Sequence, residues 1–223
     1  MSDSIHSTFV RRRSARFNPF ASFGASFGAA LLAFGALLAL GGCAGTPSAI
    51  ADIRYDFGPP NPPASAGTMP AVKVVDVGAP DVLNSDKLIY RLGYADAQQT
   101  ASYANSHWTM APSQLLTQRL RTALSSRGTV LTGADSVPAP MLKVDLSEFE
   151  QVFDSSSESH AAVTARATLF QGGKVLGQRT FVARAPAQTP DAAGGAQALA
   201  AASDDLIAQI GAWLGVQALV AAQ

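Results

Sequence analysis

The sequence predicts an α+β protein in which two helices pack on one face of a mixed, mainly antiparallel sheet. Two observations carry this prediction. Stretches that alternate between apolar and polar residues follow one another without an intervening helix, as at Met141–Glu150 and Val163–Leu169. Two other stretches, Pro112–Arg127 and Ala196–Gln217, repeat their apolar residues every three or four positions, which is the period of an amphipathic helix.

The first 42 residues have the parts of a bacterial secretory signal peptide, and we assign residues 1–42 to it. Four arginines precede an apolar run from Ala21 to Leu40, and small residues follow that run. The next residue, Cys43, is the only cysteine of the chain, so an intramolecular disulfide is impossible. Cleavage before Cys43 leaves 181 residues with a formal charge of −3, which gives no indication of nucleic-acid binding.

The segment Leu40-Gly41-Gly42-Cys43 resembles the lipobox of bacterial lipoproteins. The resemblance implies that Cys43 becomes the mature N-terminus and carries a diacylglycerol and an amide-linked acyl chain such as palmitate. Stable membrane attachment needs more than one acyl chain. An uncleaved transmembrane helix is the alternative, but the run from Ser26 to Leu40 is shorter than the ~20 residues that a spanning helix needs. Ala44, rather than an Asp that retains lipoproteins in the inner membrane, favours the periplasmic face of the outer membrane.

Residues 43–69 are interpreted as a lipid-anchored N-terminus that contains a short edge strand and a Pro-rich linker. The strand is expected at Ile53–Phe57, where apolar and polar residues alternate. The linker is expected at Gly58–Gly67, because its prolines lack a backbone N–H and restrict the residues that precede them. Residues 70–223 then form one α+β domain.

The first half of the domain predicts three extended segments and a helix. Ala71–Val77 is rich in β-branched residues and predicts a central strand. Leu88–Leu92 predicts a second strand, and Tyr94–Trp108 a third extended segment. The helix Pro112–Arg127 begins with a proline and ends before a glycine, which are the residues preferred at these two positions. A short strand is expected at Thr129–Leu131.

The second half of the domain predicts a β-hairpin. Gly172-Gly173 is a strong signal for a two-residue turn after the strand Val163–Leu169. A regular hairpin around this turn places Arg166 opposite Arg179, and like charges that face each other are destabilising. Either the register differs from the regular one, or an acidic residue such as Asp145 neutralises the pair.

Two further features complete this half. The alternation of Met141–Glu150 breaks near its end, which predicts a β-bulge near Glu148. Pro186–Gly195 predicts a loop, and the second helix is expected to follow at Ala196–Gln217. Asp204 falls outside the apolar face of that helix.

The sequence contains no catalytic or metal-binding motif that we recognise. After cleavage the histidines are His107 and His160, and no group of Cys, His and carboxylate residues has the spacing of metal ligands. No Gly-x-Ser-x-Gly motif occurs, and the two Gly-Gly pairs lack the pattern of a phosphate-binding loop. We therefore expect a protein that is not an enzyme and needs no cofactor or metal.

Five residues are candidates for docking a partner protein: Tyr90, Arg91, Tyr94, Tyr103 and Trp108. Tyrosine, tryptophan and arginine are frequent anchors of protein interfaces. The alternative interpretation is packing, in which the aromatic rings fill the seam between the sheet and the helices. Loss of partner binding with an intact fold after Tyr90→Ala or Trp108→Ala would favour docking, whereas loss of folding would favour packing.

The order of several motifs points to a family. A Tyr-Arg pair at Tyr90-Arg91 is followed by Tyr103, by Trp108 just before a proline-containing helix start, and by a Leu/Arg-rich helix at Leu115–Leu124. In this order, the stretch from Leu88 to Gly128 resembles the ABC-type transport auxiliary lipoproteins, the family of the Pqi-system lipoprotein. Two looser matches lie outside that stretch, at Tyr55–Pro59 and Leu142–Phe149.

The resemblance implies an α+β fold and a role in transport rather than a reaction. Such lipoproteins accompany an ABC permease, its ATPase and a mammalian-cell-entry-domain protein, which move lipids or other apolar molecules between the two membranes. These proteins are the implied partners, and a homo-oligomer stays open. The alternative is a structural lipoprotein of an outer-membrane assembly or secretion machine with no transport role. The inner-membrane proteins that co-purify with the chain distinguish the two.

Overall fold

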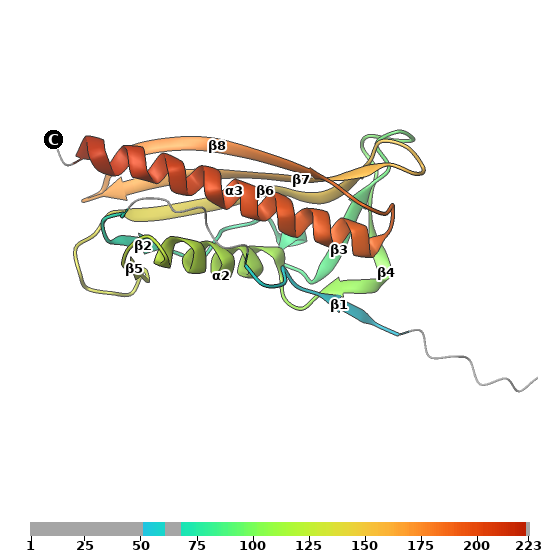
Figure 1. Cartoon of the computed structure of the whole chain (residues 1–223), viewed down its shortest axis with the longest axis horizontal. Coiled ribbons are helices and arrows are strands. Elements are labelled where there is room, and N and C mark those ends of the chain that lie inside the picture. Colours follow the sequence, from blue (N-terminus) through green and yellow to red (C-terminus); the bar gives the residue numbers. More distant parts are fainter. Residues whose placement is uncertain (1–50, 61–67, 222–223) are drawn as a thin grey trace, which may run out of the picture. The chain divides into compact units, whose positions relative to one another are not determined.

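Eight strands of the described residues form one mixed sheet (Figure 1). The structure is a computed structural model that describes residues 51–60 and 68–221. The predicted signal peptide at residues 1–42, the lipidation site Cys43 and residues 61–67 of the predicted linker lie outside the described residues.

Three strands of 13 residues each make up the longest part of the sheet: β6 (Met141–Phe153), β7 (Ser159–Gln171) and β8 (Lys174–Pro186). Both neighbouring pairs are antiparallel. The predicted hairpin between β7 and β8 is confirmed, since Gly172 and Gly173 have φ values of 53° and 80°. Only glycine adopts such positive φ values without a steric cost, so this dipeptide fixes the turn.

Five shorter strands lie on the other side of β6, in two groups. At the start of β6, β2 (Val72–Val74) pairs parallel with it and with β5 (Val130–Leu131), so β2 is the central strand that the sequence predicts. At the end of β6, β3 (Lys87–Arg91) pairs parallel with it and antiparallel with β4 (Thr100–Trp108). The edge strand β1 (Ile53–Tyr55) lies parallel to β4.

The hairpin avoids the like-charge pair in both of the ways that the sequence left open. Arg166 lies opposite Thr180 rather than Arg179, because an irregularity near the turn shifts the register. Asp145 of β6 lies opposite Arg166 on its other side, with a carboxylate–guanidinium distance of 3.6 Å. The arginine therefore faces an acid and a hydroxyl.

The predicted bulge in β6 is also confirmed. The register of β6 against β7 shifts between Leu146 and Glu148, which leaves Ser147 without a partner residue in β7. The hydroxyl of Ser147 donates a hydrogen bond to the carbonyl of Thr164 at 3.1 Å. A bulge bends its strand locally. In this sheet the bend lies between the two points at which β2 and β3 meet β6.

The strand β2 is shorter than the predicted range Ala71–Val77. The Val75 N–H still donates to the Leu142 carbonyl of β6 at 3.3 Å. The chain then leaves the ladder, and the N–H of Val77 donates to the hydroxyl of Thr117 at 2.9 Å instead of to a strand. Thr117 belongs to the first helix. A single parallel bridge then returns the chain to β6, between Gly78 and Asp145.

The helices α2 (Pro112–Ser125) and α3 (Ala192–Ala221) cover the same face of the sheet (Figure 1). The apolar side chains of the sheet and of both helices meet in one core. Its most deeply buried members, each at most 2% exposed, include Leu142, Val144, Leu146, Leu116, Leu120, Leu124, Leu199, Leu206 and Ile210. Burial of each such side chain contributes about 1.5–3 kcal/mol. The predicted α+β fold is thus confirmed.

Helix α3 begins four residues before the predicted start at Ala196. The reason is an N-cap that the sequence pattern did not single out: the carboxylate of Asp191 accepts a hydrogen bond from the N–H of Gly194 at 2.8 Å. Gly195 lies so close to Gln151 of β6 that a Cβ atom there would clash with the Gln151 amide. Gly195 therefore lets the first turn of α3 approach the sheet, whereas Gly194 leaves room for Thr189 of the preceding loop.

The described segment before β2 takes part in the packing. Phe57 and Met69 are 7% and 8% exposed, and both belong to the core. Packed structure thus includes residues on the N-terminal side of position 70, where we expect the domain to start.

Candidate docking site

Three of the five candidate docking residues lie where β3 and β4 meet the end of β6. The rings of Tyr90 and Tyr103 have a centroid distance of 4.8 Å, and Phe153 approaches Tyr90 at 6.0 Å. The hydroxyl of Tyr103 donates to the side-chain amide oxygen (Oε1) of Gln151 at 2.9 Å. Burial raises the pKa of Tyr103 to about 12. Both tyrosines are half-buried, so only part of each ring is accessible to a partner.

The amide of Gln151 extends this polar contact into the interior. Gln151 is fully buried, and its amide nitrogen donates to the hydroxyl of Ser159 at 2.8 Å. Its oxygen accepts from Tyr103, so both ends of the amide have a partner. A buried amide with satisfied hydrogen bonds holds its neighbours in one arrangement. Tyr103 is therefore positioned by the core rather than free to adapt.

Arg91 is held by a bidentate ion pair. Its guanidinium donates to both carboxylate oxygens of Glu150, at 2.7 and 3.1 Å, and to the carbonyl of Ala97 at 2.7 Å. The hydrogen bond to Glu150 raises the pKa of Arg91 further, so the group stays charged.

Tyr94 is 53% exposed. Of the five candidates, Tyr94 offers the most surface to a partner.

Trp108 lies in the core and not on a surface. Its side chain is 0% exposed and packs edge-on against Phe57 and Phe149, at centroid distances of 5.8 and 5.6 Å. Its indole N–H has no hydrogen-bond partner among the described residues. The packing alternative therefore describes Trp108, whose position at the end of β4 alternates inward with the strand. We remove it from the docking candidates.

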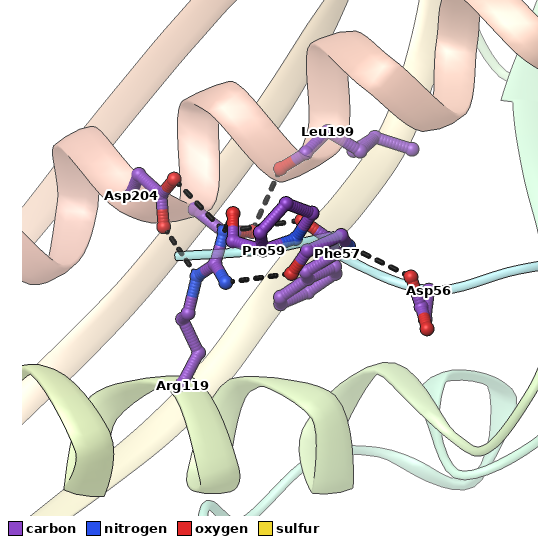
Figure 2. A network of polar contacts seen from close by, with 8 residues as sticks. Asp56, Phe57, Pro59, Arg119, Leu199 and Asp204 are labelled. Carbon is purple, nitrogen blue, oxygen red and sulfur yellow. Dashed lines mark hydrogen bonds and ion pairs between the residues drawn. The ribbon is translucent and has the colours of Figure 1, made fainter. Parts of the chain in front are cut away.

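The structure also contains a buried junction that the sequence did not predict (Figure 2). Arg119 of α2 donates to both carboxylate oxygens of Asp204 in α3, at 2.7 and 3.1 Å. The same guanidinium donates to three successive carbonyls, of Phe57, Gly58 and Pro59, at 2.9–3.2 Å. We call these residues the Arg119 junction. It ties the segment that leads from the predicted anchor to both helices at once.

Sequence reasoning missed this junction because its signals are weak and distant. Arg119 lies on the flank of the leucine stripe of α2, and Asp204 lies off the apolar face of α3. Each residue alone is typical of a solvated helix surface. Their separation of 85 residues leaves no local pattern that links them. Only 8% of the Arg119 side chain is exposed, so the pair is largely desolvated.

Residues 51–60 and 68–221 contain no candidate metal site and no helix that could span a membrane. No group of three or more His, Cys, Asp or Glu side chains there could hold a metal ion. Neither α2 nor α3 combines the length and the apolar composition that crossing a membrane requires.

The family model for the ABC-type transport auxiliary lipoprotein component matches residues 55–211. The chain belongs to this family. All four remaining docking candidates and the Arg119 junction lie inside the matched range. The family assignment made from the stretch Leu88–Gly128 is thus confirmed.

Solved structures agree with this auxiliary-lipoprotein fold. A crystal structure of a DUF330 protein from Xanthomonas campestris matches 77% of this chain and 96% of its own, with 19% identity and a TM-score of 0.64. A crystal structure of an uncharacterized protein matches 75% of this chain and 98% of its own, with 17% identity and a TM-score of 0.57. A comparison with curated protein sequences gives no match. At these identities the structural likeness shows the fold alone.

Proposed function

We propose that this auxiliary lipoprotein docks an ABC transport system of the mammalian-cell-entry-domain type at the outer membrane. Its transported molecules would be lipids or other apolar compounds that move between the membranes. The observation that carries this proposal is the family match, which covers residues 55–211. The lipobox-like segment that ends at Cys43 supports attachment to the membrane at the N-terminus.

The protein acts, in this proposal, by binding and not by catalysis. Lipidated Cys43 holds the chain at the periplasmic face of the outer membrane, and the following residues span the distance to the domain. The Arg119 junction supports a firm connection, because Arg119 of α2 donates three hydrogen bonds to the carbonyls of residues 57–59 and two to Asp204 of α3. A pulling force on the lipid anchor is then borne by α2 and α3 as well as by β1.

Docking is assigned to the end of the sheet that carries Tyr90, Arg91, Tyr94 and Tyr103. Tyr94 supplies an exposed ring, and the buried contacts of Tyr103 and Arg91 hold the remaining surface in one geometry. Preorganised aromatic and arginine side chains are the usual energetic centre of an interface.

The experiment is a pull-down of the lipidated protein, with a C-terminal tag, from solubilised membranes of the source cell. The control is Cys43→Ser secreted behind a cleavable signal peptide. We expect a mammalian-cell-entry-domain protein or its permease to co-purify with the lipidated form. Recovery of outer-membrane assembly proteins alone would instead support the structural alternative.

Surface variants then locate the docking face. Tyr94→Ala should reduce the recovered transporter protein while leaving the melting temperature unchanged, because this side chain is 53% exposed. The matched control is Val216→Ala on α3, which removes a side chain that is 58% exposed at a different place. Equal recovery with both variants would exclude Tyr94 from the interface.

A further inference from the structure

The last strand of the sheet, β8, has a strand partner on one side only. It pairs with β7, and no other strand of the described residues lies along its outer edge (Figure 1). From residue 177 to residue 186, β8 keeps one regular antiparallel register with β7. In such a ladder the main-chain groups of successive residues point alternately toward the partner strand and away from it. Every second residue of β8 therefore presents its N–H and carbonyl to the outer edge.

One hydrogen bond identifies these residues. Directly after β8, the N–H of Ala187 donates to the carbonyl of Ser159 in β7 at 2.9 Å. Residue 187 thus directs its main-chain groups toward β7, and by alternation the odd-numbered residues back to Gly177 do the same. The main-chain groups that point outward belong to Gln178, Thr180, Val182 and Arg184.

One of these outward groups has a partner in the described part of the chain. The side-chain amide of Gln209 in α3 donates to the Val182 carbonyl at 3.3 Å. A donor from outside the sheet can therefore reach this edge. The side chains at positions 178, 180, 182 and 184 are all exposed, and Val182 is 50% exposed. The edge from residue 178 to residue 184 spans roughly 20 Å, which is the length of a short extended peptide.

The charged side chains of β8 are all basic. The strand contains Lys174, Arg179 and Arg184, and no Asp or Glu. Arg184 lies 3.8 Å from Glu148 of β6. Arg179 is exposed and lies over the ring of Phe181 at 5.2 Å, but it has no carboxylate partner among the residues that the structure describes. This edge therefore offers a cation to an acidic group of another molecule.

The same charges argue against a second copy of this chain as the occupant. Pairing of two β8 edges would join two strands whose charged residues are all basic, and like charges on neighbouring strands are destabilising. Basic residues on an edge strand are a common means of preventing such self-pairing. On α3, Asp205 accepts from Gln209 at 2.9 Å and forms no ion pair with a described residue of β8. An acidic segment can therefore pair with Arg179.

We propose that the edge of β8 from Gln178 to Arg184 binds an extended, acidic segment of the transporter partner, which adds to the sheet as a further strand. Main-chain hydrogen bonds to the outward groups hold the segment, and the Gln209 amide yields the Val182 carbonyl to an N–H of the added strand. An Asp or Glu of the segment pairs with Arg179, and an apolar residue covers Val182. The identity of the partner rests on the proposed function, whereas the open edge does not.

The register restricts the sequence of the segment. Arg179 and Val182 lie on opposite faces of β8, since their positions differ by an odd number. Residues of the added strand that contact them must also lie on opposite faces. The acidic and the apolar residue of the segment are therefore separated by an odd number of positions.

The first test is amide hydrogen exchange at single-residue resolution in the purified complex. The outward amides of Gln178, Thr180 and Val182 should exchange about tenfold or more slowly than in the unbound protein, because the added strand protects them. The amides of Arg179 and Phe181 already bond to β7 and should change far less, which makes the alternation its own control. Unchanged exchange at the outward amides in a complex that forms normally overturns the proposal.

The second test removes one outward N–H. Thr180→Pro deletes a donor of the open edge and no hydrogen bond to β7, and proline is tolerated on edge strands. Its melting temperature should stay near that of the wild type, while recovery of the transporter protein falls by about tenfold. Thr180→Ala keeps the N–H and is the matched control, which should bind normally.

A charge substitution tests the edge without altering its backbone. Arg179→Glu should lower recovery of the transporter protein by about tenfold, because it faces the acidic segment with a like charge. The control is Val216→Glu on α3, where the side chain is 58% exposed and lies away from this edge. This variant keeps the proposal testable even if Thr180→Pro does not fold.

The outcomes separate this inference from the proposed function. Normal recovery of the transporter protein with both Thr180→Pro and Arg179→Glu overturns the β8 site and leaves the proposed function standing. Recovery of assembly proteins alone, with protection of the outward amides in that complex, overturns the proposed function and supports the edge as the docking site. Protection of these amides by a second copy of the chain overturns the proposed occupant.

Discussion

The guanidinium of Arg119 and the carboxylate of Asp204 form a bidentate ion pair between α2 and α3. The same guanidinium donates to the backbone carbonyls of residues 57–59 (Figure 2). One side chain thus connects the two helices to the segment nearest the predicted lipid anchor. Because Arg119 is largely buried, the arrangement depends on every partner being present.

Substitution at this junction should destabilise the protein strongly. Asp204→Asn leaves a buried guanidinium without its carboxylate, and we expect the free energy of unfolding to fall by about 3 kcal/mol. Arg119→Lys keeps the charge but loses the planar fork that reaches both Asp204 of α3 and the carbonyls of residues 57–59, so it should also be destabilising. Urea denaturation of the secreted Cys43→Ser protein measures both effects.

The control for this prediction is Lys143→Gln, which removes an exposed ion pair with Asp145. It should change the free energy of unfolding by less than about 1 kcal/mol. Hydrogen exchange at residues 57–59 should rise in Asp204→Asn. A variant as stable as the wild type, with this segment still protected, would show that the carbonyl contacts alone hold the junction.

Two glycines of α3 should respond in opposite ways to alanine. At Gly195 a Cβ atom would clash with the Gln151 amide, so Gly195→Ala should be destabilising by about 1–3 kcal/mol. At Gly215 the nearest atom to an added methyl group is Arg127 Nη2 at 3.4 Å, an ordinary contact. Gly215→Ala should therefore be neutral or stabilising by up to about 1 kcal/mol, through helix propensity. Thermal unfolding of the two variants side by side tests the contrast, and equal melting temperatures would contradict it.

Truncation of Trp108 should affect folding before it affects docking. Trp108→Ala removes a fully buried indole from its contacts with Phe57 and Phe149 and should be destabilising by about 3–5 kcal/mol. Trp108→Phe should cost less, because the lost N–H has no hydrogen-bond partner in the described structure. Tyr94→Ala is the exposed control. A stable Trp108→Ala protein that fails to recover its partner would return Trp108 to the docking site.

The cap of α3 should make stability depend on pH. The hydrogen bond from the Gly194 N–H, followed by that from Thr189, lowers the pKa of Asp191 below its usual value. A lowered folded-state pKa stabilises the fold above the ordinary value of about 3.9, and this contribution is lost as the pH falls through the folded-state value. Asp191→Ala should therefore be less stable than the wild type by about 1 kcal/mol at pH 7, with a smaller difference below pH 4.

Asp191→Asn provides the matched control for this pH dependence. Asparagine caps a helix about as well as aspartate but does not titrate, so its difference in stability from Asp191→Ala should stay constant between pH 7 and pH 2.5. Chemical denaturation across that range measures all three proteins. A wild-type advantage that is the same at every pH would mean that the cap acts without its charge.

Local features of the chain were predictable because neighbouring residues decide them. The hairpin follows from Gly172-Gly173, and the core face of α2 follows from leucines spaced four residues apart. The start of α3 was wrong by four residues because two glycines weaken a helical pattern, while Asp191 and the fit against Gln151 stabilise a helix there. That compensation comes from β6, far away in the sequence.

The sequence by itself determined the α+β class and most element positions, since these depend on periodicity and on turn residues. It also indicated the family, through the order of motifs between Leu88 and Gly128 that resembles the auxiliary lipoproteins. Only the tertiary structure decided which polar residues are buried and which aromatic residues are not available to a partner. Arg119 and Asp204 have ordinary surface patterns until the fold brings them together across a separation of 85 residues. Long-range contacts of this kind leave no trace in a local pattern, because each partner's environment is supplied by the other.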